Sequence, residues 1–238
     1  MNGGTWELDD GTSTGTFAMV FNGVTQQLGG TGSILVDNLM VYTGTTLTVN
    51  QVPTVTGVLI NNGTLKQTQT VSNATVNFLT ISADKYRGVD IQTPNDLGVV
   101  TVTVQGNADS CTNDPTSPAY IKRCFSITPT NNATATLTLW ATDAEMNGID
   151  FLSGDEGALY RYVTNQWVEQ ARVEFGTDTN SYNYVTADVG GFSSFLLGKS
   201  GDTPTAVTYA SMTSGAALWA PVSLLFLGGA ALVLRKRR

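Results

Sequence analysis

The chain has 238 residues, 41% of them hydrophobic, which is enough for one or two folded domains and excludes a disordered tail. There are 12 Lys and Arg residues against 19 Asp and Glu residues, so the net charge at pH 7 is −7. Four of the basic residues end the chain, so the remainder is still more acidic and repels nucleic-acid phosphates. We therefore predict that no nucleic acid is a partner.

The first residues carry neither the basic nor the apolar segment of a secretory signal peptide. The rest of the composition nevertheless indicates an extracellular protein, because charged residues are only 13% and Thr, Asn and Gly are abundant. An exported protein needs a signal, so we expect this chain to be a fragment of a longer product.

Residues 1–82 consist of short apolar segments separated by Gly and Asn, a pattern typical of strands. Segments 32–36, 44–49 and 57–60 each begin with Gly, and these glycines are 12 and 13 residues apart. Segments 60–65 and 66–71 follow. This spacing predicts a β-solenoid with two or more short strands in each coil.

The stretch from Thr43 to Thr68 resembles the right-handed parallel β-helix coils of secreted bacterial adhesins and polymorphic surface proteins. The same loose pattern occurs in pectate-lyase-like enzymes. The alternative for residues 1–82 is a few strands of an ordinary sandwich.

Residues 83–199 have longer strands. Segments 99–104 and 135–139 alternate apolar residues with Thr, and segments 159–163 and 167–169 flank a polar turn as in a hairpin. Segments 182–189 and 195–197 supply two more strands. Strands spaced by turns in this way predict an immunoglobulin-like β-sandwich.

The order of five short segments in this region is also informative. They are 138–140, 143–145, 159–162, 167–169 and 191–198. Together they resemble a sandwich module common near the C-termini of bacterial surface proteins. The resemblance implies an extracellular position and no particular chemistry.

Two cysteines, Cys111 and Cys124, flank a loop that contains Pro115 and Pro118. In an oxidising compartment they would pair and stabilise the fold by roughly 2–3 kcal/mol. The chain has no His and no C-x-x-C motif, so a redox or metal site at these residues is disfavoured.

Oxygen ligands crowd into one turn-rich stretch at Asp143, Glu145, Asn147 and Asp150, and Ca²⁺ prefers such ligands. The stretch opens like an EF-hand loop, but its twelfth position is Gly154 rather than a bidentate carboxylate. Solvated acidic loops are the favoured interpretation. We therefore predict no cofactor, with Ca²⁺ at these four residues as the alternative.

Aromatic residues on the later strands are candidates for a carbohydrate-stacking platform: Tyr160, Tyr162, Trp167, Tyr182 and Tyr184. Large aromatic residues more often fill the core of a sandwich. Catalysis is not predicted, because the common Ser and Cys nucleophile systems need a His that this chain lacks.

After a polar linker at 200–214, residues 215–234 run without a charge and include Gly215, Trp219, Pro221 and Leu234. A helix of this length matches the thickness of the bilayer core. The basic residues Arg235, Lys236, Arg237 and Arg238 follow, so the preceding chain is predicted to lie outside the cell, with the helix in the membrane.

This layout resembles bacterial C-terminal sorting signals, although no Leu-Pro-x-Thr-Gly motif precedes it. Retention as an anchor and processing by another sorting enzyme both stay open.

These features predict a non-catalytic structural or adhesive protein anchored at the cell surface, with an extracellular glycan or protein as its ligand. The rival interpretation is the C-terminal ancillary and anchoring region of a surface enzyme that degrades polysaccharides.

Overall fold

The computed structural model describes residues 5–8, 18–108, 111, 120–151 and 153–201. These residues form an all-β structure, as predicted, with single helical turns at α1 (Ser82–Lys85) and η1 (Asp143–Glu145).

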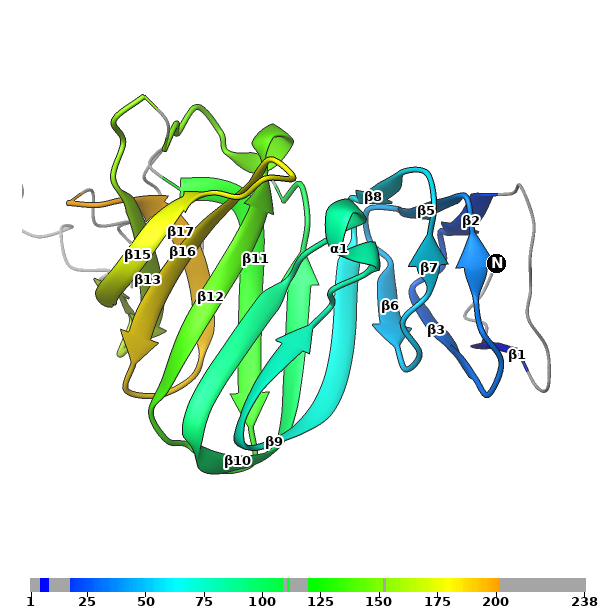
Figure 1. The fold of residues 1–238 in the computed structure, drawn as a ribbon, viewed down its shortest axis with the longest axis horizontal. Helices are drawn as coiled ribbons and strands as arrows, with labels where there is room; N and C mark the ends of the chain where they lie inside the picture. The colour runs from blue at the N-terminus through cyan, green and yellow to red at the C-terminus, as the bar shows by residue number, and fades with distance from the viewer. Residues whose placement is uncertain (1–4, 9–17, 109–110, 112–119, 152, 202–238) are drawn as a thin grey trace, which may run out of the picture. The chain divides into compact units, whose positions relative to one another are not determined.

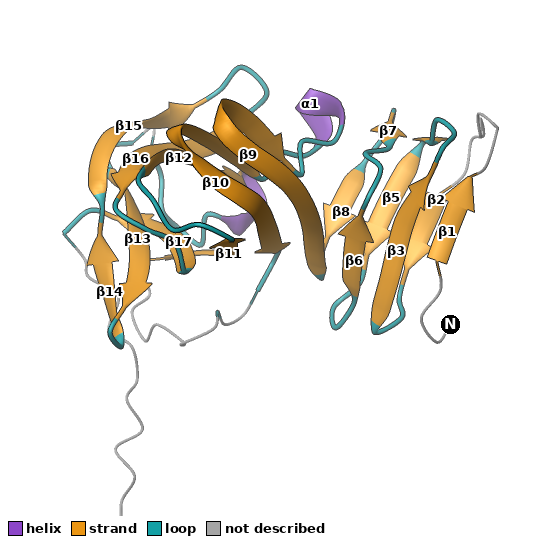
Figure 2. Ribbon diagram, turned by 90° about the horizontal axis from the view of Figure 1, so that it is seen from below, coloured by secondary structure: helices purple, strands orange, loops and turns teal. Residues whose placement is uncertain are grey.

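The N-terminal third is built from three parallel sheets (Figure 2). The first joins β1 (Thr5–Leu8), β3 (Thr25–Gly30), β6 (Thr46–Val49) and the start of β9 (Thr64–Phe78), the second joins β2 (Ala18–Phe21), β5 (Asn38–Val41) and β8 (Leu59–Asn61), and the third joins β4 (Leu35–Val36) and β7 (Thr54–Val55). We call these residues the parallel region. A closed solenoid coil is not seen in the part of the chain that the structure describes.

Apolar residues at alternate positions explain why these strands stack. Leu39 pairs with Leu59, and Leu47 pairs with Leu65, so the same side-chain type recurs from one strand to the next. Leu39, Leu47 and Leu65 are completely buried. Burying such side chains away from water is what holds together strands that are too short to be stable alone.

The glycine spacing does not measure the repeat of the parallel region. Gly32, Gly44 and Gly57 precede β4, β6 and β8, which belong to three different sheets. The chain returns to the same sheet only after a longer interval, as the pairing of Leu39 with Leu59 shows. Glycine therefore marks successive corners. At Gly57 a side chain would meet the backbone of Asp37, which explains the need for glycine there.

The remaining strands form two packed layers (Figure 1). They are β10 (Val89–Gln105), β11 (Tyr120–Pro129), β12 (Ala135–Thr142), β13 (Gly157–Val163), β14 (Gln166–Glu169), β15 (Ala171–Thr177), β16 (Tyr182–Val189) and β17 (Ser194–Lys199). The first layer follows the order β9, β10, β12, β16, β15, and the second follows β9, β10, β11, β17, β13, β14.

The two longest strands belong to both layers. The first residues of β10 pair with β12, and its last residues pair with β11. Irregular pairing between Thr93 and Gly98 separates these halves, and Gly98 has a positive φ of 67°. A bulge bends a strand, so β9 and β10 can turn from one layer into the other at this point.

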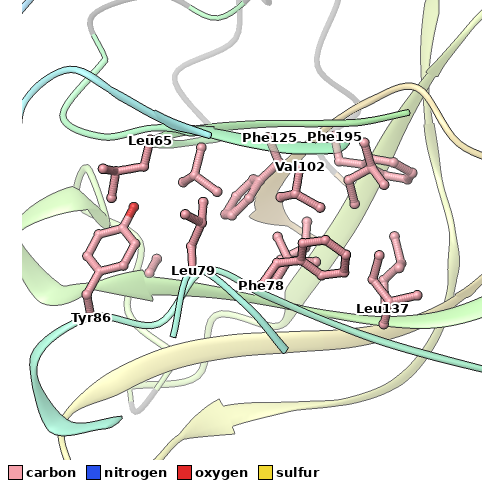
Figure 3. Close-up of a cluster of buried hydrophobic side chains, with 14 of the residues drawn as sticks. Leu65, Phe78, Leu79, Tyr86, Val102, Phe125, Leu137 and Phe195 are labelled. Atoms are coloured by element: carbon pink, nitrogen blue, oxygen red, sulfur yellow. The ribbon is translucent and has the colours of Figure 1, made fainter. Parts of the chain in front are cut away.

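The core lies between the layers. Figure 3 shows Leu65, Val102, Phe125 and Phe195 along one side and Tyr86, Leu79, Phe78 and Leu137 along the other. All eight side chains are buried. The alternation of these residues with polar ones along their strands is the pattern of sheets with one covered face.

The strands that were predicted within residues 83–199 agree with the structure. Segments 135–139 and 182–189 lie in β12 and β16, and the predicted hairpin is β13 paired with β14. In the N-terminal region, segment 60–65 spans the end of β8 and the first residues of β9, and segment 66–71 lies within β9. β11 and β15 were not predicted.

The predicted boundary between residues 82 and 83 lies in α1, between the paired strands β9 and β10. The predicted linker 200–214 lies outside the described residues from 202 onward. The predicted membrane span from Gly215 to Leu234, with Trp219 and Pro221, also lies there, as does the basic stop from Arg235 to Arg238. Within the described ranges, no helix combines the length and apolarity needed to cross a membrane.

Candidate functional site

A groove of about 730 Å³ crosses four strands of the first layer at one end. Its lining comes from three consecutive positions on each of β9, β10, β12 and β16 or their adjoining residues: Asn73, Ala74, Thr75, Gln92, Thr93, Pro94, Thr134, Ala135, Thr136, Asp188, Val189 and Gly190. Half of these residues are polar but uncharged, and one, Asp188, is acidic. We call this surface the polar groove.

One row of side chains runs across the polar groove. Gln92 pairs with Thr75 on one side and with Thr136 on the other, and Thr136 pairs with Asp188. Directly paired residues of antiparallel strands point to the same face of a sheet. The four side chains therefore form a continuous line of hydroxyl, amide and carboxylate groups.

Part of this row is fixed internally, and part is free for a ligand. The hydroxyl of Thr136 donates to Oδ1 of Asp188 at 2.6 Å, which orients the carboxylate. The amide of Gln92 and the hydroxyl of Thr75 make no hydrogen bond to another described residue, and both residues are exposed. The row thus presents exposed donors and acceptors that no other described residue engages.

The backbone beneath the polar groove is held by side chains of β10. Oγ1 of Thr93 donates to the carbonyl of Thr134 at 2.9 Å, and Nδ2 of Asn95 donates to the same carbonyl at 3.1 Å. Thr93 is almost fully buried. These bonds tie the bend in β10 to the residue before β12, so the floor of the groove is preformed.

The ionisable content of the polar groove limits its chemistry. Among the described lining residues, Asp188 is the only one that carries a charge. Hydrolysis of a glycosidic bond commonly uses two carboxylates on opposite sides of that bond. The groove offers donors and acceptors of hydrogen bonds, but its described lining does not present two carboxylates.

On the same face, charged and aromatic side chains surround Trp140. Trp140 lies two positions along β12 from Thr138 and four positions from Thr136. The guanidinium of Arg87 lies 3.3 Å from the centre of the Trp140 ring, and it also pairs with Asp178 at 2.9 Å. Nε1 of Trp140 donates to Asp90 at 2.9 Å. Arg87 thus covers the indole face, which leaves Trp140 only 6% exposed and unavailable for stacking on a ligand.

Burial, the largest effect on Asp90, raises the pKa of its carboxyl above the ordinary value. The hydrogen bond from Trp140 and the nearby Arg87 both act in the opposite direction. Burial in this cluster therefore disfavours the ionised form of the Asp90 carboxyl in the folded protein.

The aromatic residues proposed as a carbohydrate platform do not form one. Tyr160, Trp167 and Tyr182 are buried. Tyr162 shares a face with Tyr160, as its spacing predicts, and its ring meets that of Trp167 edge to face at 5.2 Å. Tyr160, Trp167 and Tyr162 instead belong to another apolar cluster, as expected for large aromatic side chains in a sandwich. Tyr184 packs against Trp140 with ring centroids 5.0 Å apart.

The apolar cluster around Tyr160 and Trp167 covers the outer face of the second layer and contains the predicted disulfide. It consists of Ala108, Cys111, Tyr120, Cys124, Ala158, Tyr160, Trp167 and Leu196. Cys111 and Cys124 are joined, with their Cα atoms 5.5 Å apart, so the predicted pairing is confirmed. We call these residues the outer cluster.

The predicted calcium ligands have separate partners. Asp143 accepts from Asn183 at 2.7 Å, Asn147 donates to the carbonyl of Tyr120, and Asp150 accepts from the backbone of Ser153. Glu145 is buried and paired with Arg123. In the described residues, no group of three or more acidic, His or Cys side chains could hold a metal ion. Calcium binding here stays the alternative to the prediction of no cofactor.

The sequence indicated the outward Thr residues of β12 but not the polar groove. Thr136 was recognisable as the polar position of an alternating strand, whereas its neighbours Gln92 and Asp188 lie far away in the chain. Only knowledge of the strand order brings them together. No single segment of the sequence therefore carries a pattern that predicts the groove.

Comparisons of this chain with models of protein families, with curated proteins and with solved structures found no match.

Proposed function

We propose that this chain is a non-catalytic structural or adhesive protein of the cell surface. The main support is the double pairing of Leu65, which is bonded in parallel to Leu47 of β6 and antiparallel to Val104 of β10. One strand therefore belongs to the parallel region and to both layers. A sheet that continues without a linker transmits force through its ladder of hydrogen bonds, as a stalk or spacer must.

The finer fold belongs to this proposal. The parallel region is a piece of a β-solenoid, and the two layers are an immunoglobulin-like sandwich. Parallel pairing in three sheets supports the first assignment, and two packed antiparallel layers with one core support the second. The Cys111–Cys124 disulfide supports an oxidising compartment, because such bonds persist mainly outside the cytosol.

In this proposal, residues 215–238 hold the protein at the membrane and the polar groove contacts the extracellular ligand. The groove also favours a second candidate, the ancillary region of a surface enzyme that degrades polysaccharides, because a non-catalytic glycan contact serves either role. Upstream sequence separates the two. Further coils would support the adhesin-like protein, whereas coils with clustered Asp, Arg and Lys would support the enzyme.

The proposal is tested by exporting the full chain behind a signal peptide in a bacterium that does not attach to coated surfaces. Protease added to intact cells is expected to remove the chain, and the cells are expected to attach to surfaces coated with glycans or matrix proteins. A chain that protease cannot reach would overturn the surface location. A chain that protease reaches, on cells that attach no better than cells exporting an unrelated sandwich, would overturn adhesion.

A further inference from the structure

We propose that the polar groove binds an uncharged glycan chain. This inference rests on the adhesive function proposed above and names the class of ligand. It assigns the contact to the row formed by Thr75, Gln92, Thr136 and Asp188.

The hydrogen-bonding groups of this row suit a ligand rich in hydroxyl groups. A hydroxyl both donates and accepts, so it can give a hydrogen bond to the carboxylate of Asp188 and exchange bonds with the amide of Gln92. Thr75 adds a third group of mixed character. Oδ1 of Asp188 is already bonded to Thr136, so the carboxylate is held in place before a ligand arrives.

Charge favours an uncharged ligand over an anionic one. The only ionised group in the described lining is the carboxylate of Asp188, and the chain as a whole has a net charge of −7. Sulfated, phosphorylated or uronic-acid chains would bring like charge into a surface that has no cation to meet it. A neutral glycan avoids this repulsion.

The dimensions of the groove suit a short segment of a chain. A volume of about 730 Å³ lies within the range of small-molecule sites, and the row spans four strands. Neighbouring strands are about 4.8 Å apart, so the outer groups of the row are separated by roughly 14 Å. Several sugar rings can therefore touch the row at once.

The affinity of one groove is expected to be low. Two large aromatic residues share this face: Trp140 is covered by Arg87 and adds no stacking, and Tyr184, its partner on β16, packs against the Trp140 ring with the centroids 5.0 Å apart. A few hydrogen bonds exchanged with water leave a Kd of about 0.1–1 mM. Many copies on one cell would raise the effective affinity, as adhesion requires.

The test uses the full chain on an array of neutral and acidic oligosaccharides, followed by titration calorimetry with the neutral oligosaccharide that binds best. Gln92→Ala and Asp188→Ala are each expected to weaken binding by 10-fold or more. Gln166→Ala on β14 and Thr128→Ala on β11 are matched controls, because both residues are exposed on strands away from the groove and should leave binding unchanged. Unfolding midpoints of all four variants confirm that they fold.

Three outcomes would overturn the inference: no binding of neutral oligosaccharides at 5 mM, binding unchanged in both groove variants, or preference for acidic glycans. Cell attachment separates this inference from the function it rests on. If cells exporting the chain attach and the Gln92→Ala variant attaches equally well, the groove is excluded while adhesion stands. If glycan binds at the groove but cells do not attach, the groove stands and adhesion fails.

Discussion

Arg123 of β11 lies 2.7 Å from Glu145 of η1, and the two side chains are 1% and 2% exposed. The guanidinium also donates to the carbonyls of Arg87 and Trp140, and it stands over the ring of Tyr86. Burial alone lowers the pKa of Arg123, but the combined attraction of Glu145, Tyr86 and Tyr182 outweighs this and raises it. Arg123 therefore stays charged inside the protein, beside the end of the parallel region.

Glu145→Gln is expected to lower the free energy of unfolding by about 3–5 kcal/mol, because it leaves Arg123 buried without a counter-charge. Gln preserves the shape of the side chain and an acceptor for the Thr142 hydroxyl, so the loss reports on charge. The measurement is urea unfolding at pH 7. Glu156→Gln is the matched control, because Glu156 pairs with Arg172 at 2.8 Å but is 62% exposed. The control should cost less than about 1 kcal/mol, and equal costs would contradict the argument.

The disulfide is expected to stabilise the outer cluster. Replacing Cys111 and Cys124 together by Ser should lower the free energy of unfolding by about 2–4 kcal/mol, because the unfolded chain gains the freedom that the cross-link removes. Unfolding with and without reductant provides the measurement. The wild-type protein should lose stability when reduced, whereas the Ser variant should not respond. Finding two reactive thiols in the unreduced native protein would show that the bond does not form.

Stability should depend on pH through Asp90. The folded protein keeps this carboxyl protonated to a higher pH than the unfolded chain does, because its pKa is raised by burial. As the pH rises above about 4, the unfolded chain releases its proton first, and the free energy of unfolding falls. Asp90→Asn removes this loss. Its stability relative to the wild type is therefore expected to increase between pH 4 and pH 7.

Asp155 provides the control of opposite sign. Hydrogen bonds from the backbone of Asp150 and from Lys199 lower the pKa of its carboxyl. Asp155→Asn should therefore lose stability relative to the wild type as the pH rises through the range where Asp155 ionises. Chemical unfolding of both variants across this range is the measurement. Parallel curves for Asp90→Asn and the wild type would exclude the role given to Asp90.

Gly106 follows β10 where the layers meet the parallel region, and its backbone N–H bonds to Gly63 at 3.0 Å. A Cβ at this position would overlap the carbonyl oxygen of Asn61, so the backbone would have to move. We expect Gly106→Ala to cost about 1–3 kcal/mol and to increase proteolysis near residue 62. Gly190→Ala is the control, since its Cβ would meet nothing within 4 Å. A neutral Gly106→Ala variant would show that the junction is not tightly packed.

The sequence alone determined the elements whose signal is local. The β13–β14 hairpin was predicted from alternation and a polar turn, and Thr164 and Asn165 have the positive φ values typical of a two-residue hairpin turn. β12 and β16 followed from apolar residues at every second position, because one face of each strand is covered. The nearby cysteines predicted their own pairing.

β11 escaped prediction because both of its faces are covered. The core covers Ile121, Arg123 and Phe125, and the outer cluster covers Tyr120 and Cys124, so no alternation is visible. The apolar period of two arises only where one face meets water. A strand that is covered on both sides lacks this alternation, so the pattern does not mark it as a strand.

The long-range relationships were decided by the tertiary structure. Glu145 looked like a solvated or calcium-binding residue until the fold placed Arg123 against it. The glycine spacing of 12 and 13 suggested a repeat, yet only strand pairing revealed that Leu39 meets Leu59. Thr75, Gln92, Thr136 and Asp188 became one row for the same reason. Periodicity tells which face of a strand is covered, but not which distant strand lies beside it, because that choice depends on how the whole core packs.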